Sequence, residues 1–148
     1  DDMQEKLKGV IESLGYHGIG GKKSSGYGKF EIAEFIDLSL SGDKSLHALS
    51  DMLTSEGSAY MCLSNTVPAK EEISVLKDEN SWYALSYNGG FVSSPDYADT
   101  FLKKKNIASV RAGSCLSARI SGRVADVANQ GSHSVFYYGK SIQAGVKL

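Results

Sequence analysis

The sequence has 148 residues, of which 41% are hydrophobic and 22% charged, as is typical of one globular domain with a real core. No run approaches the ~18 apolar residues of a membrane-spanning helix, and the first residues do not resemble a signal peptide. Two cysteines and three scattered histidines lack the spacing of a zinc site. We therefore expect no metal, no cofactor and no membrane contact, and reduced thiols in a cytoplasmic protein.

The net charge of −1 conceals a segregation of charge along the chain. Residues 15–30 carry +3, residues 31–99 carry −9, and residues 100–148 carry +7 with Asp126 as their only acid. Such asymmetry is typical of a protein in which one face meets an anionic partner. Folding can also mix these segments, so both interpretations stay open at this point.

The first predicted element is a helix over residues 3–14, because apolar side chains recur there at helical spacing. Gly15 stands where a left-handed residue ends many helices. The apolar face of this helix requires a sheet, and residues 29–36 are predicted to be one strand of it. That strand supplies only one member of the sheet. The members of the apolar face are Met3, Leu7, Val10, Ile11 and Leu14.

Between these two elements lies a glycine-rich loop, residues 18–29, with five glycines, three lysines, two serines and no acid. Glycines at this density let the backbone adopt positive φ and approach a partner closely, and successive exposed N–H groups form anion sites. The spacing fits neither a Walker A loop nor a dinucleotide-binding fingerprint, and both of those motifs follow a strand and open a helix. The loop predicts contacts with a phosphate backbone, with a hairpin of solvated lysines as the alternative.

Residues 37–148 are predicted to form a second domain of α+β class with an antiparallel sheet. Helices are expected after the capping residue Asp43 and over residues 71–77. Asn88-Gly89-Gly90 predicts a hairpin between strands at 82–87 and 91–93. Strands at 135–138 and 142–146 are predicted to pair with each other, and further strands are expected at 58–64, 109–112, 115–120 and 123–127.

The stretch GGKKSSGYGKFE, residues 20–31, is similar to the glycine-rich loop of the RAMP superfamily of CRISPR RNA-binding proteins. Residues 76–94, 111–127 and 131–146 extend the resemblance to the subunits that hold the 5′ handle of the guide RNA in type III-A (Csm) effector complexes. Those subunits are much longer, so the chain is expected to be a C-terminal part. The resemblance implies a ferredoxin-like or RRM-like RAMP architecture with the first domain largely missing. In that architecture residues 1–36, as a helix, the glycine-rich loop and a strand, close the first domain, and its other strands precede them.

The resemblance also implies a non-catalytic subunit that binds guide (CRISPR) RNA beside two protein neighbours, the large polymerase-like subunit and the adjacent backbone RAMP subunit. Secondary contacts with RNA or a partner are expected from His17, Arg111, Arg119 and Arg123, although charged strands can equally be solvated edges. The residues expected to contact RNA are those of the loop: Gly20, Gly21, Lys22, Lys23, Ser24, Ser25, Gly26, Tyr27, Gly28 and Lys29.

Two other functions stay open at the level of sequence. Some RAMP relatives are metal-independent endoribonucleases, and in such an enzyme His17 would be the general acid or base, with Tyr27 nearby. A structural adaptor whose loop contacts protein is the other. Tyrosines can stack on unpaired bases, but we interpret those of the second part as core or strand residues: Tyr83, Tyr87, Tyr97, Tyr137 and Tyr138.

Overall fold

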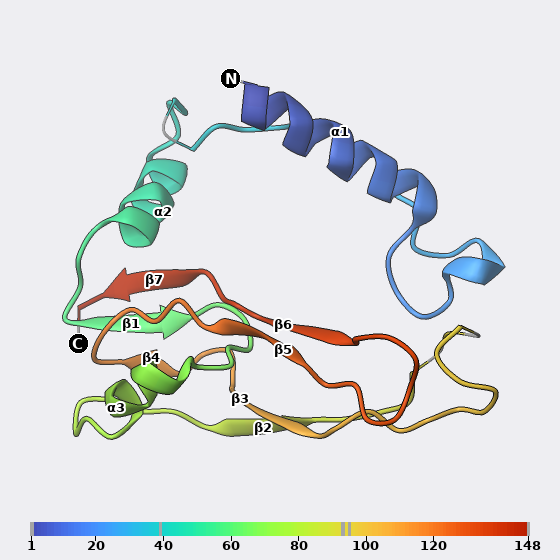
Figure 1. The fold of residues 1–148 in the computed structure, drawn as a ribbon. Coiled ribbons are helices and arrows are strands. Elements are labelled where there is room, and N and C mark those ends of the chain that lie inside the picture. The colour runs from blue at the N-terminus through green and yellow to red at the C-terminus, as the bar shows by residue number, and fades with distance from the viewer. Residues whose placement is uncertain (1, 39, 93, 95, 148) are drawn as a thin grey trace. The chain divides into compact units, whose positions relative to one another are not determined.

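The computed structural model describes residues 2–38, 40–92, 94 and 96–147, and Figure 1 shows its helices and strands. The chain divides into two compact units, Asp1–Ser41 and Gly42–Leu148. The domain boundary expected at residue 37 stays a prediction. Within the described ranges, no helix is both long enough and apolar enough to cross a membrane.

The first unit begins with helix α1 (Asp2–His17), which extends three residues beyond its predicted end. Gly15 lies inside the helix, where a Cβ would come within 2.4 Å of the carbonyl oxygen of Phe30. The left-handed residue is Gly18, with a φ of 80°, and its amide donates to the carbonyl of Leu14 at 2.8 Å. Gly15 is therefore required for close packing, and Gly18 ends the helix.

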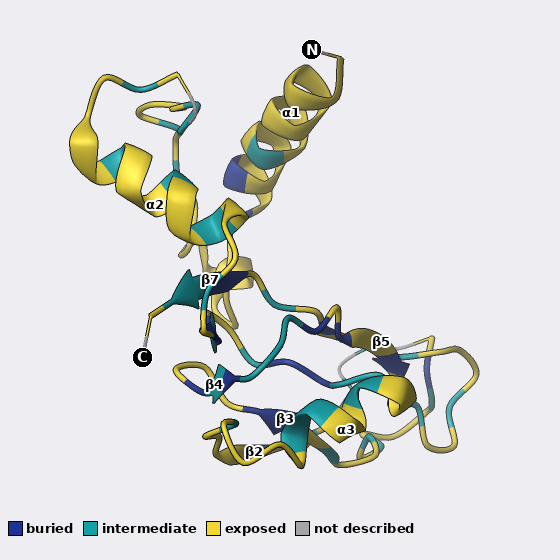
Figure 2. Cartoon of the chain, turned by 90° about the vertical axis from the view of Figure 1, so that its left-hand side faces the viewer, coloured by how far each residue is buried: buried dark blue, intermediate teal, exposed yellow. Residues whose placement is uncertain are grey.

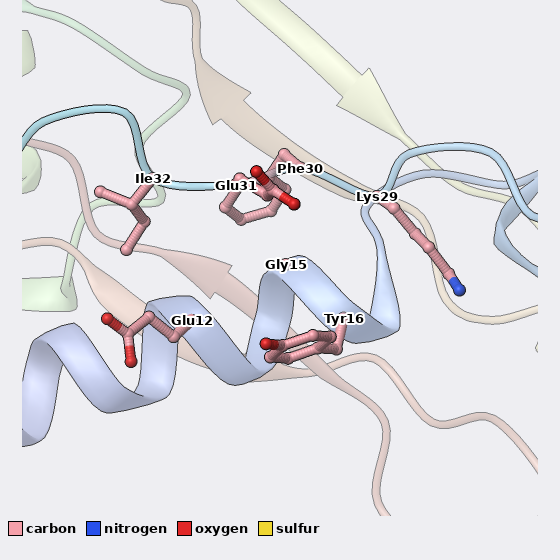
Figure 3. Close-up of a pocket in the computed structure, with 7 residues that line it drawn as sticks. All are labelled: Glu12, Gly15, Tyr16, Lys29, Phe30, Glu31 and Ile32. Carbon is pink, nitrogen blue, oxygen red and sulfur yellow. The ribbon is translucent and has the colours of Figure 1, made fainter.

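The strand predicted over residues 29–36 is wrong, since no residue of this segment belongs to a strand. The segment instead runs back beside α1 (Figure 3), and the amide of Phe30 donates to the carbonyl of Gly15 at 3.3 Å. A strand forms only where a neighbouring strand completes the ladder of hydrogen bonds. Among the described residues no such neighbour pairs with this segment.

The apolar face of α1 is largely exposed. Met3, Leu7 and Val10 keep 70%, 50% and 65% of their surface accessible, and the helix is mostly yellow in Figure 2. Gly15 and Gly18 are the buried residues of the first unit among those described. The helix thus carries the apolar face that the sequence predicts, with no described strand to cover it.

The second unit has the predicted α+β class with antiparallel strands. Helix α2 (Lys44–Thr54) begins after Asp43, whose carboxylate accepts a hydrogen bond from the amide of Ser45 at 2.7 Å. A short 3-10 turn, η2 (Lys70–Glu72), continues into helix α3 (Ile73–Leu76). Both helical predictions for this part of the chain are confirmed.

Seven short strands form three antiparallel sheets within the described residues (Figure 1). One sheet has three strands, with the first strand of the unit at its centre, and the other two sheets are pairs. The three-stranded sheet has the order β4 (Cys115–Leu116), β1 (Ala59–Cys62), β7 (Gln143–Val146). The pairs are β2 (Leu85–Asn88) with β3 (Ile107–Val110), and β5 (Arg123–Asp126) with β6 (Phe136–Gly139).

The tight hairpin predicted at Asn88-Gly89-Gly90 is wrong. β2 pairs with β3, and the ladder continues past the glycines, where Phe91 bridges Lys103 and the amide of Val92 donates to the carbonyl of Leu102 at 2.9 Å. Gly90, with a φ of 128°, lies within this ribbon, where its carbonyl accepts a hydrogen bond from the amide of Lys104 at 3.0 Å. The chain reverses only beyond Val92.

The predicted pairing of the last two strands with each other is also wrong. β6 pairs with β5, whereas β7 pairs with β1. The chain changes sheets directly after Gly139, whose carbonyl accepts a hydrogen bond from the amide of Val67 at 2.8 Å. This arrangement gives the buried strand β1 a partner on both sides, which a local hairpin would not do.

The core of the second unit lies between α3 and the strands. Cys62, Val110 and Leu116 are fully buried, and Val75 and Leu76 of α3 pack against this cluster. Burial raises the pKa of the Cys62 thiol above its ordinary value, so the thiol stays protonated and behaves as a small apolar side chain. The second unit therefore has a hydrophobic core of its own.

Candidate nucleic-acid interface

The base of the glycine-rich loop is closed by two backbone segments that cross at glycines. The amide of Ile19 donates to the carbonyl of Gly28 at 2.9 Å. Gly18 and Gly28 adopt φ of 80° and 79°, and a Cβ at Gly28 would lie 1.9 Å from the carbonyl oxygen of Ile19. Only glycine fits such a crossing without strain, so these residues hold the loop in one shape.

The tip of the loop is a single turn of 3-10 helix, η1 (Lys23–Ser25). The amides of Ser25 and Gly26 donate within the turn, each at 3.0 Å, to the carbonyls of Lys22 and Lys23. Five successive amides before them form no hydrogen bond with any described residue, namely Gly20, Gly21, Lys22, Lys23 and Ser24. A run of unpaired N–H groups of this kind is suited to bind an anion.

The lysines of the loop are exposed and form no ion pair with a described residue. Lys22, Lys23 and Lys29 are all solvent-accessible. In the part of the chain that the structure describes, the only ion pair joins Lys6 to Asp2 at 2.6 Å. The three ammonium groups therefore add uncompensated positive charge beside the unpaired amides.

A groove of about 610 Å³ lies beside the base of this loop, between α1 and the segment that follows the loop (Figure 3). Glu12 and Glu31 line it together with Tyr16 and Phe30. In Figure 3 the side chain of Lys29 extends away from both carboxylates. Two carboxylates disfavour a phosphate in the groove.

His17, the last residue of α1, lies at the base of the loop and is exposed. Its Nδ1 is 2.9 Å from the carbonyl oxygen of Ser13. Because a carbonyl can only accept, Nδ1 carries the proton, and Nε2 holds the lone pair in the neutral ring. The backbone of Tyr27 passes close to Gly18, so His17 and Tyr27 are both at this end of the loop.

The three arginines singled out by sequence have different environments. The guanidinium of Arg119 donates to the carbonyls of Gln143 at 2.7 Å and Ser55 at 2.9 Å, and it lies 4.8 Å from the ring centroid of Tyr60. Arg119 therefore stabilises the second unit. Arg111 and Arg123 are exposed and form no ion pair with a described residue.

Tyrosines of the second unit divide into buried and exposed groups. Tyr97 is only 2% exposed, which agrees with its interpretation as a core residue, whereas Tyr138 is 71% exposed. Sequence reasoning considered Tyr138 for base stacking but interpreted it as a core or strand residue, and it did not single out the neighbouring Lys140. The turn at Gly139 was the available signal, since residues beside a turn are commonly exposed.

Within the described ranges, no cluster of metal-ligating side chains occurs.

These features define a class: an α+β protein of antiparallel strands preceded by a helix and a lysine-bearing glycine loop. A family model, the CRISPR Csm4 C-terminal domain, matches residues 55–146. The chain belongs to this family, and the RAMP-like, type III-A assignment expected from the sequence is confirmed.

Individual relatives extend the match into the first unit. The chain is 30% identical over 140 residues to the protein named CRISPR system Cms protein Csm4 of Mycobacterium tuberculosis, in strains CDC 1551 / Oshkosh and ATCC 25618 / H37Rv, covering 93% of this chain and 43% of the relative. The protein of the same name from Streptococcus thermophilus is 30% identical over 138 residues, which cover 92% of this chain and 43% of the relative. The chain thus spans less than half the length of these relatives. Because each match covers at least 92% of this chain, it includes the glycine-rich loop.

Proposed function

We propose that the chain is part of a subunit that holds the 5′ handle of guide RNA in a type III-A effector complex, through its glycine-rich loop and without cleaving the RNA. The observation that carries this proposal is the run of unpaired amides from Gly20 to Ser24 beside three exposed, unpaired lysines. Membership of a CRISPR family supports RNA as the source of the phosphates.

The loop recognises the RNA backbone in this proposal. Its amides donate to phosphate oxygens, and Lys22, Lys23 and Lys29 neutralise charge. The hydroxyls of Ser24 and Ser25 donate to phosphate or 2′-OH groups, and the 2′-OH is what distinguishes RNA from DNA. Contacts of this kind fix the register of the RNA and carry no sequence information of their own.

The proposal includes two protein neighbours, the large polymerase-like subunit and the adjacent backbone RAMP subunit, in a cytoplasmic complex. An exposed apolar face supports contact with protein, and α1 has such a face at Met3, Leu7 and Val10. Both cysteines of the chain are free thiols, as is usual in a reducing compartment.

The direct test is the salt dependence of RNA binding by the double variant Lys22→Ala/Lys23→Ala. Each lost phosphate contact reduces the slope of log K against log salt by about 0.7 for a single strand. The double variant Lys6→Ala/Lys8→Ala removes the same charge from α1 and should leave the slope unchanged. An unchanged slope in the loop variant contradicts the proposal, as does the absence of RNA, seen in the 260/280 nm absorbance ratio, from the purified complex.

The endoribonuclease alternative is tested by incubating the full-length protein with labelled precursor RNA in EDTA. Binding without catalysis predicts no cleavage at any pH. Cleavage that the His17→Ala variant abolishes, with a bell-shaped pH dependence, would instead establish His17 as a catalytic residue.

A further inference from the structure

A second concave surface lies within the second unit, where the chain leaves β1 and where β6 turns into β7. It is a cavity of about 620 Å³, and its lining includes Ser64, Asn65, Tyr138, Lys140 and Ser141. No acidic residue lines it. The cavity is separate in sequence from the glycine-rich loop.

Backbone hydrogen bonds from several strands fix the walls of this cavity. The amide of Leu63 donates to the carbonyl of Ile142 at 3.0 Å, and the amide of Val67 donates to the carbonyl of Gly139. The side-chain oxygen of Asn65 accepts from the amide of Ala112 at 3.1 Å. That bond orients the amide group of Asn65, and its Nδ2 forms no hydrogen bond with a described residue.

Tyr138 and Lys140 provide an exposed ring and an unpaired cation at the same place. Tyr138 lies opposite Val124 in the β5–β6 pair and is 71% exposed. Lys140 is exposed and has no ion pair among the described residues. A ring to stack on, a cation for phosphate and a free amide donor are the groups with which proteins bind an unpaired nucleotide.

We infer that this cavity binds one unpaired nucleotide of single-stranded RNA, with its base stacked on Tyr138, a phosphate beside Lys140 and Asn65 Nδ2 donating to the base edge. The lining favours RNA over an apolar protein segment, since its charged side chain is the cation Lys140 and no acidic residue lines the cavity. The inference rests on the proposed function only for the identity of the nucleic acid, and it uses none of the loop residues.

The test uses the full chain and a fluorescently labelled ten-nucleotide oligouridylate, with binding followed by anisotropy. Tyr138→Leu should weaken binding by about fivefold or more, because stacking on one aromatic side chain contributes that much per base. Tyr138→Phe keeps the ring and should bind like the unmodified chain. The matched control is Phe136→Leu, because Phe136 lies two residues earlier in β6, is equally exposed at 71% and does not line the cavity.

Lys140→Ala should reduce the salt slope by about 0.7. Oligouridylate that carries 4-thiouridine should crosslink on irradiation to a peptide that contains Tyr138. Equal losses in Tyr138→Leu and Phe136→Leu would overturn the inference, as would unchanged affinity in Tyr138→Leu. If Tyr138→Leu instead prevents capture of another subunit of the complex and leaves RNA affinity unchanged, the cavity is a protein site and the inference is wrong.

The two proposals fail separately. If Lys22→Ala/Lys23→Ala leaves the salt slope unchanged while Tyr138→Leu still weakens binding, the loop does not contact RNA and the inference about the cavity holds. If the loop variant changes the slope and Tyr138→Leu leaves the affinity unchanged, only the inference about the cavity is wrong.

Discussion

The two units of this chain hold their shapes by different means. The second unit buries side chains completely, as at Val110 and Leu116, and its strands assemble around them. In the first unit, the buried residues among those described are Gly15 and Gly18, where backbone segments pass close together. The loop is therefore shaped by glycines and backbone hydrogen bonds, and the second unit by its core. This difference predicts that substitutions in the core of the second unit change the stability of the chain, whereas substitutions in the loop change its affinity for RNA.

The largest expected effect on stability is in the core of the second unit. Leu116→Ala should lower the free energy of unfolding by about 2–5 kcal/mol, because a buried leucine leaves a cavity when it is truncated. Leu7→Ala in α1, where half of the side chain is exposed, should change it by no more than about 0.5 kcal/mol. Urea denaturation of both variants measures the difference. Equal losses would show that α1 belongs to the same cooperative core.

The next effect concerns the crossing at the base of the loop. Gly28→Ala forces a side chain into a left-handed backbone, at a cost of about 1–2 kcal/mol, and places its Cβ against the carbonyl of Ile19. We expect RNA affinity to fall by about tenfold, while urea denaturation of the second unit is unchanged. The control is Gly42→Ala, because Gly42 lies outside the loop and has open space around it and no positive φ. A normal affinity in Gly28→Ala would show that the crossing does not shape the site.

A smaller effect is expected at Arg119, where the sequence suggested a contact with RNA or a partner. Arg119→Lys loses the fork that reaches the carbonyls of Gln143 and Ser55, and should destabilise the second unit by about 1–2 kcal/mol. Arg123→Lys, at an exposed position, should be neutral in stability. RNA affinity in Arg119→Lys should be unchanged. A loss of affinity without a loss of stability would show that Arg119 contacts RNA.

The smallest effect is a dependence of stability on pH at Asp126. Hydrogen bonds from the amide of Ala128, the side chain of Ser134 and the amide of Val135, the first contributing most, hold the pKa of this carboxyl below its usual value. A lowered pKa stabilises the folded chain above the unfolded value of about 4, and this contribution is lost as pH falls further. The melting temperature of Asp126→Ala should thus lie below that of the unmodified chain at pH 7, and the gap should narrow below about pH 4.

The sequence predicted local features better than pairings between distant segments. The capping of α2 by Asp43 and the position of the glycine-rich loop both depend on neighbouring residues, and both types of signal are local. The partners of β6 and β7 depend on β5 and β1, which lie far away in the chain, so a local turn signal at Gly139 gave the wrong pairing. Pairing of strands is set by packing of the whole sheet.

The candidate site was predictable only in part for the same reason. Lysines and glycines identified the loop, but the closure of its base by Gly28 and Ile19 depends on backbone geometry that composition does not contain. The exposure of Tyr138 depends on which face of β6 is covered, and alternation along a strand does not tell which face that is. The sequence does not distinguish Arg119 from Arg111 and Arg123, because its two carbonyl partners, Gln143 and Ser55, lie far from it in the chain.

Amide hydrogen exchange of the full chain, with and without saturating single-stranded RNA, tests the central claim most directly. The unpaired amides of Gly20, Gly21, Lys22, Lys23 and Ser24 should exchange more slowly when RNA is bound, because they then donate to phosphates. The amides of Ser25 and Gly26 already have acceptors in the turn and provide the internal control, with little change expected. If the five unpaired amides exchange at the same rate with RNA bound, the loop does not hold the RNA backbone and the account is contradicted.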